Sequence, residues 1–101
     1  MPGTFAAITS VTNSGFTFSP ANITITQGDT VSFTLQASHN AIEVSQTTYN
    51  ANGTTPLGGG FSVAFGASNA LVTGLSVGVH YYVCSNHAGS GMKGTITVNA
   101  A

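Results

Sequence analysis

Short runs of alternating apolar and polar residues, separated by turn-forming residues, constrain most strongly what this 101-residue chain can fold into. Side chains alternate between the two faces of a strand, so such runs predict strands with one buried face. The clearest runs, residues 23–25 and 31–35, lie on either side of a Gln-Gly-Asp turn and predict a hairpin. No apolar pattern of helical period continues over ten residues, which argues against a helical fold.

Similar runs recur along the whole chain. The segment between residues 42 and 60 is the exception, because it is rich in Gly, Asn and Thr and shows no period. Several short strands with turns between them predict an all-β fold, an antiparallel Greek-key β-sandwich of about 7–8 strands, as a single domain over residues 1–101. The further strands are expected over residues 4–12, 16–18, 61–65, 70–73, 79–84 and 94–99.

Charge is nearly absent from the sequence. Asp29, Glu43 and Lys93 are the only charged side chains besides three His. Nucleic-acid binding draws most of its affinity from Lys and Arg on phosphates, so this composition argues against a nucleic-acid partner. It also removes long-range steering toward a charged partner.

The sequence offers no targeting or membrane segment. No run approaches the roughly 18 apolar residues that a membrane helix needs, so no membrane span is expected. Residues 1–3 are typical of the start of a mature domain whose export signal has been left off. The single cysteine, Cys84, cannot form an internal disulfide.

Three soft or borderline metal donors gather in one loop near the C-terminal end of the sequence. Cys84 is followed by His87 three residues later and by Met92 eight residues later. Two His, one Cys and a weak axial Met form the ligand set that suits copper in electron-transfer proteins. His39, which follows a strand-like run, is the candidate for the second imidazole.

Other interpretations of these residues are open. A lone Cys is often a buried small hydrophobe, and Met92 could fill a gap in the core. Zinc accepts Cys and His, but its structural sites do not favour a thioether. A Cys–His nucleophile pair is the enzymatic alternative, although Met92 has no role in that chemistry. The spacing of Cys84, His87 and Met92 favours copper over these alternatives.

This arrangement of an early His and a terminal C-x2-H-x4-M loop resembles the blue copper proteins, the cupredoxins, most closely their plastocyanin-like branch. The resemblance extends over Phe-Ser-Pro at residues 18–20, residues 23–25 and 28–33, His39 with Asn40, and residues 78–98. It implies one copper ion per chain, bound by His39, Cys84, His87 and an axial Met92. It also implies that residues 42–60 are irregular or carry a short helix.

The resemblance implies supporting roles for two further residues. Asn40 would tie the two ligand-bearing loops together, and its backbone amide would donate a hydrogen bond to the Cys84 sulfur; alternatively, it is merely a turn residue. The Ser85 hydroxyl would bridge the same loops. Asn86 departs from the family pattern, which often has Pro before the second His, and this change adds a backbone donor near the metal.

By resemblance, the function is one-electron transfer through Cu(II)/Cu(I) cycling, by an extracytoplasmic monomer that meets redox partners transiently. An oxidase or nitrite reductase would need further His clusters, and the chain has three His in all, so we expect no enzyme activity. The rival functions are copper carriage or storage, and a structural or adhesive module of a larger surface protein. A neutral apolar patch around His87 would dock the partner, formed with Ala88, Gly89 and Gly91 and joined by Gly15, Phe16 and Ala37.

His80 is excluded from the predicted ligand set by its distance from Cys84 along the strand. His80, Tyr82 and Cys84 share one face of the same strand, so Tyr82 is expected in the core. His80 then lies roughly 13 Å along the strand from Cys84, too far to bind the same ion. An aromatic residue is usual here in the family, so His80 departs from the pattern.

Overall fold

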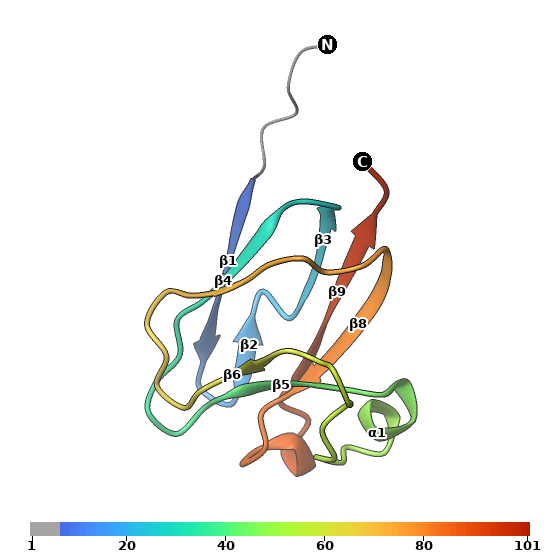
Figure 1. Cartoon of the computed structure of the whole chain (residues 1–101). Helices are drawn as coiled ribbons and strands as arrows, with labels where there is room; N and C mark the ends of the chain where they lie inside the picture. The colour runs from blue at the N-terminus through green and yellow to red at the C-terminus, as the bar shows by residue number, and fades with distance from the viewer. Residues whose placement is uncertain (1–6) are drawn as a thin grey trace.

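A computed structural model describes residues 7–101, which fold as two β-sheets that face each other (Figure 1). The all-β prediction is confirmed. Within these residues there are nine strands, one short α-helix and one 3-10 helix. In chain order they are β1 (Ile8–Ser14), β2 (Thr17–Ser19), β3 (Asn22–Thr26), β4 (Thr30–Phe33), β5 (Ala41–Val44), α1 (Gln46–Asn50), β6 (Ser62–Val63), β7 (Ala70–Val72), β8 (Gly78–Val83), the 3-10 helix (Ala88–Ser90) and β9 (Lys93–Asn99).

Both sheets are mixed, and most of their strand pairs are antiparallel, as the predicted β-sandwich implies. One sheet has the order β2-β1-β4-β7, and the other has the order β3-β9-β8-β5-β6. The pairs β1–β4 and β3–β9 are parallel, and the remaining pairs are antiparallel. The first strand is found over Ile8–Ser14, and residues 4–6 of the strand expected over residues 4–12 lie outside the described residues, as do residues 1–3.

The predicted hairpin over residues 23–35 is wrong. The strands β3 and β4 both exist, but β3 pairs with β9 whereas β4 pairs with β1 and β7. The turn between them carries the chain from one sheet to the other. Asp29 fixes this turn by accepting hydrogen bonds from the backbone N–H groups of Ala7 and Thr26, each at 3.0 Å, and these bonds lower the pKa of its carboxyl group. Gly28 provides the positive φ of 99°.

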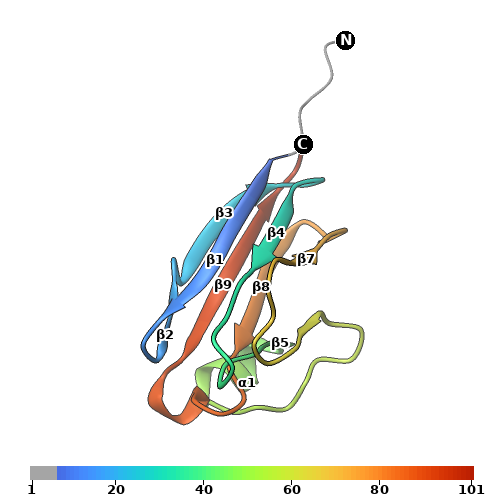
Figure 2. The same cartoon turned by 90° about the vertical axis from the view of Figure 1, so that its left-hand side faces the viewer.

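The core cluster draws on strands of both sheets and so lies between them. Figure 2 shows β1 and β4 of one sheet in front of β9 and β8 of the other. Alternate residues of each strand point inward, which is why β3 reads exposed, buried, exposed, buried along its first four residues. Tyr82 is fully buried, as predicted, and its hydroxyl donates to the Ala21 carbonyl at 3.2 Å. Burial raises the pKa of this phenol. The core also contains Val11, Phe18, Ile23, Ile25, Val31, Phe33, Val63, Ile96 and Val98.

The strand β5 is buried along its whole length, which hid it from the sequence prediction. Its side chains face the core on one side and a second apolar cluster on the other, so its burial does not alternate. That outer cluster, which joins Ile42, Val44 and Val83, lies against Tyr49 of α1. Ser45 caps α1 by accepting a hydrogen bond from the Thr48 N–H, consistent with the short helix that the resemblance implied.

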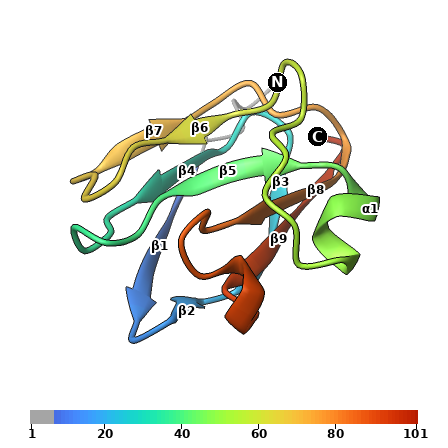
Figure 3. The same ribbon diagram turned by 90° about the horizontal axis from the view of Figure 1, so that it is seen from below.

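The loops gather at one end of the sandwich. The loop after β8, the turn between β1 and β2 and the loop before β5 lie together there, while the C-terminus and the start of β1 lie at the opposite end (Figures 1 and 3). Within residues 7–101 there is no helix long and apolar enough to cross a membrane.

Candidate metal centre

Cys84 and His87 lie in the loop that follows β8. This loop closes on itself, because the Cys84 N–H donates to the Met92 carbonyl at 3.0 Å and the Met92 N–H donates to the His87 carbonyl at 3.1 Å. The His87 N–H donates in turn to the Cys84 carbonyl at 3.1 Å. Gly91 ends the 3-10 helix in the left-handed conformation, with φ 86°, which glycine adopts without steric cost. The loop is therefore preformed by its own backbone.

His39 reaches the same place from the loop before β5. Its main chain is held on both sides, by its N–H to the Gln36 carbonyl at 3.0 Å and by its carbonyl, which accepts from the Gly66 N–H at 3.1 Å. The side chain is only 2% exposed. Burial and the nearby His87 lower the pKa of His39, while a contact with the Gly15 backbone opposes the shift. A lowered pKa favours the neutral imidazole, which is the form that binds a metal.

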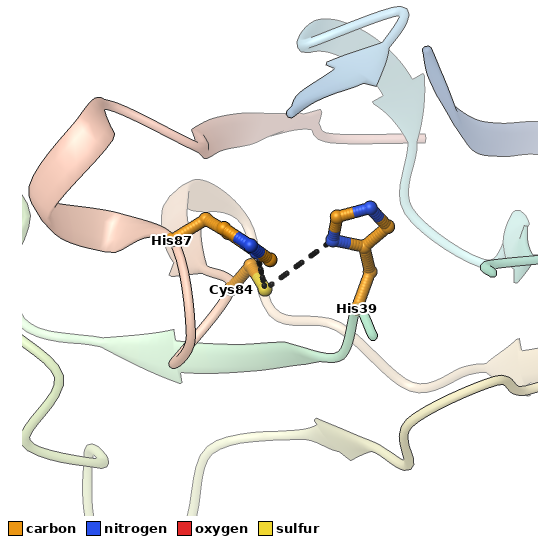
Figure 4. Close-up of side chains that lie close together, drawn as sticks. All are labelled: His39, Cys84 and His87. Carbon is orange, nitrogen blue, oxygen red and sulfur yellow. Dashed lines mark hydrogen bonds between the residues drawn. The ribbon is translucent and has the colours of Figure 1, made fainter. Parts of the chain in front are cut away.

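The donor atoms of His39, Cys84 and His87 point toward one another (Figure 4). The Cys84 Sγ lies 3.8 Å from Nδ1 of His39 and 3.6 Å from Nδ1 of His87. One donor atom from each residue lies within 4.8 Å of the other two. An ion about 2.3 Å from a thiolate and about 2.0 Å from an imidazole nitrogen, with roughly 120° between them, separates these donors by about 3.7 Å. Both sulfur–nitrogen distances of the cluster are therefore those expected around one metal ion.

The chemistry of the donor set is that of a copper site. A thiolate with two imidazoles is the trigonal set that blue copper sites use, completed by a weak axial ligand. Met92, the predicted axial ligand, is fully buried and packs in the core cluster that includes Cys84. Its role as a ligand stays a prediction.

Asn40 and Ser85 join the two loops, as the resemblance implied. The Asn40 Oδ1 accepts hydrogen bonds from the Ser85 N–H at 2.8 Å and from the Ser85 hydroxyl at 3.2 Å. Asn86 adds a third link, since its side-chain amide donates to the Ser38 carbonyl at 3.1 Å. Within residues 7–101, Sγ of Cys84 contacts the Ser38 carbonyl and the two imidazoles. No hydrogen bond from the backbone N–H of Asn40 to this sulfur is found there, in contrast to what the resemblance implied.

His80 lies outside this cluster, as predicted. Its Nδ1 is 2.7 Å from Oε2 of Glu43, and its Nε2 is 2.7 Å from the Ser76 carbonyl. Glu43 is 7% exposed, and its Oε1 also accepts from the Phe61 N–H at 3.2 Å. Sequence reasoning missed this pair; the signal was a carboxylate within the otherwise apolar run of residues 41–44.

The surface around His87 differs in part from the expected patch. Ala88 contributes nothing to it, because this residue is only 1% exposed and packs in the outer cluster with Ile42 and Val83. His87 itself is partly exposed. The other members of the expected patch, Gly15, Phe16, Ala37, Gly89 and Gly91, are exposed.

Comparison with known proteins decides the family. Residues 6–99 match the family of copper binding proteins, plastocyanin/azurin family. This chain belongs to that family. A comparison with curated proteins gives no match.

Solved structures agree with this assignment. A pseudoazurin from a Sinorhizobium species is 26% identical, with a TM-score of 0.70, over 92% of this chain and 74% of that one. Spinach plantacyanin is 23% identical, with a TM-score of 0.68, over 91% and 99% of the two chains. A copper-containing nitrite reductase from Thermus scotoductus SA-01 is 24% identical, with a TM-score of 0.64, over 90% of this chain and 22% of that one. The similarity to the last two proteins is a similarity of fold only. This chain is a copper-binding cupredoxin β-sandwich.

Proposed function

We propose that this chain is a type 1 copper protein that carries one electron at a time, with His39, Cys84, His87 and an axial Met92 as the ligands. The observation that carries the proposal is the convergence of one sulfur and two imidazole nitrogens within 4.8 Å, in a chain of the plastocyanin/azurin family. Copper bound there would supply the electron transfer by cycling between Cu(II) and Cu(I).

The protein's part is to hold the donors still while the charge changes. The loop of Cys84 and His87 is closed by its own backbone bonds, and Asn40 ties it to the His39 loop. Donors that do not move between the two oxidation states keep the rearrangement small. The buried Tyr82 and Met92 help to keep water from the inner side of the site.

Electrons would enter and leave at the His87 side, because His87 is the partly exposed imidazole whereas His39 is 2% exposed. The exposed residues around it, Gly15, Phe16, Ala37, Gly89 and Gly91, carry no charge. A neutral surface of this kind suits small transient interfaces below about 1,200 Å² with redox partners. Docking should therefore depend weakly on salt. We place this monomeric carrier outside the cytoplasm.

We propose a carrier rather than an enzyme because of how the three His are used. His80 is committed to Glu43 and Ser76, so two imidazoles remain for copper. A second copper centre of the kind that oxidases and reductases need would lack ligands in this chain. Copper carriage or storage uses the same ligands, and slow self-exchange with readily released Cu(I) would favour it over electron transfer.

A visible spectrum after addition of one equivalent of Cu(II) tests the proposal. We expect an intense sulfur-to-copper charge-transfer band toward the red end, and we expect Cys84→Ser to abolish it. A native protein that binds Cu(II) without this band, or a band that persists in Cys84→Ser, would contradict the ligand assignment. His80→Gln serves as the matched control and should keep the band.

A further inference from the structure

The exposed ring of Phe16 lies against the imidazole of His87. Phe16 occupies the turn between β1 and β2 and is 59% exposed, although its neighbour Phe18 is 3% exposed. Its ring stacks on His87 with a centroid separation of 4.5 Å and an interplanar angle of 23°. The same ring meets His39 edge-on, at 6.0 Å and 75°. One side chain from a third loop thus contacts both imidazoles of the site.

His87 depends on such a contact more than His39 does. Metal-binding histidines usually have the second ring nitrogen held by a carboxylate, a carbonyl or water, which fixes the ring orientation. Within the described part of the chain, Nδ1 of His87 faces Sγ of Cys84 and no protein atom is found to accept a hydrogen bond from Nε2. The ring is also partly exposed. Packing against Phe16, whose ring stacks on the imidazole, therefore constrains the orientation of His87.

The turn that carries Phe16 is anchored to the loop that carries His39. The Asn13 side chain makes two bonds to Gln36: its Nδ2 donates to Oε1 and its Oδ1 accepts from the Gln36 N–H, each at 2.8 Å. The Thr17 hydroxyl closes the turn by donating to the Ser14 carbonyl at 2.8 Å. These bonds hold the backbone on both sides of Phe16 relative to the site, as a positioning residue requires.

We propose that Phe16 is a positioning residue of the copper site, whose stack on His87 keeps Nδ1 aimed at the point that His39 and Cys84 also face. This inference rests on the proposed function, because it concerns the same copper ligands. The attraction of an aromatic pair beyond its buried area corresponds to about two- to tenfold in an equilibrium constant. The stack biases His87 toward its ligating orientation by a factor of that size.

The test compares native protein with Phe16→Leu and Phe16→Tyr. Leucine keeps an apolar side chain of similar bulk without a ring, whereas tyrosine keeps the ring. Phe65→Leu is the matched control, because Phe65 is also exposed, at 48%, and no stacking of its ring on either imidazole is found within residues 7–101. None of these side chains is buried, so folding should survive each change.

Two readouts are required, one without copper and one with it. In metal-free protein, side-chain NMR should show close contacts between the Phe16 and His87 rings, and Phe16→Leu should leave the His87 ring averaged over orientations. In the loaded protein, Phe16→Leu should speed removal of Cu(I) by a competing chelator about two- to tenfold and shift the reduction potential. Phe16→Tyr and Phe65→Leu should behave as native.

The outcomes separate the two proposals. An unchanged release rate and potential in Phe16→Leu would overturn the positioning role, as would equal changes in Phe65→Leu or a loss in Phe16→Tyr as large as that in Phe16→Leu. A native protein without the sulfur-to-copper band would instead overturn the proposed function. In that case the metal-free NMR still decides whether Phe16 orients His87.

Discussion

Two clusters that contain histidine lie along the same pair of strands, and only one of them resembles a metal site. His39 and Cys84 lie next to β5 and β8 at the loop end of the sandwich, and Glu43 and His80 lie four residues further along each strand. Strand alternation keeps all four on the inner face. The neighbourhood in sequence and the buried setting are thus nearly the same for both clusters.

The difference is what the ring nitrogens face. Both nitrogens of His80 lie 2.7 Å from oxygen acceptors, those of Glu43 and Ser76, so the pair is complete within the protein. Nδ1 of His39 and of His87 instead face the Cys84 sulfur at 3.8 and 3.6 Å, with no carboxylate in the group. Soft and borderline donors that converge on one point suit a metal, whereas a histidine between two oxygens suits a structural clamp.

The largest expected contrast is between His39→Ala and His80→Ala. Loss of His39 removes a donor, so Cu(II) affinity should fall by more than the roughly 10–100-fold that supporting residues cost. Loss of His80 should leave copper affinity unchanged, but it strands the Glu43 carboxylate and should cost about 1–3 kcal/mol of unfolding free energy. Copper titration and urea unfolding of both variants measure the contrast. An equal loss of copper affinity in both variants would contradict the conclusion that only one of the two clusters is a metal site.

A smaller effect is expected from the link between the ligand loops. Asn40→Ala removes the acceptor of both Ser85 bonds and should weaken copper binding about 10–100-fold. Ser85→Ala removes only the hydroxyl bond and should cost less in the same titration. If Ser85→Ala proved the more damaging change, the link would not act through the Asn40 side chain.

The smallest change in copper binding is expected from Met92→Leu. This variant tests whether Met92 is a fourth donor of the metal cluster. The swap nearly conserves volume, so stability should change by less than about 1.5 kcal/mol. The charge-transfer band should persist, and the reduction potential measured by voltammetry should shift, because the axial ligand tunes the potential of such a site. A potential equal to that of the native protein would identify Met92 as a core residue only.

The sequence was sufficient for the local part of the site. The Cys84–His87 spacing and the turn-forming residues around it make the loop a short-range structure, and parity places Tyr82 and Cys84 inward. Tyr82 and Cys84 are both fully buried, in agreement with this prediction. The fit of His39 to the same point required a long-range contact, which the resemblance supplied and the periodicity could not.

The strand pairing and the Glu43–His80 pair could not be predicted from the sequence, for physical reasons. Alternation in β3 and β4 shows that each strand has a buried face. It does not show whether the two strands pair in one sheet or belong to opposed sheets, because both arrangements give the same pattern. The strand β5 has no alternation, because it is covered on both sides. The contact between Phe16 and His87 joins loops that are far apart in the chain, and no local pattern encodes it.

X-ray absorption at the copper edge tests the central claim most directly, because it counts the atoms around the ion. We predict one sulfur at short distance and two imidazole nitrogens in the native protein loaded with one equivalent of copper. We also predict loss of the short sulfur contribution in Cys84→Ser. A native copper shell made only of nitrogen and oxygen atoms would contradict the account.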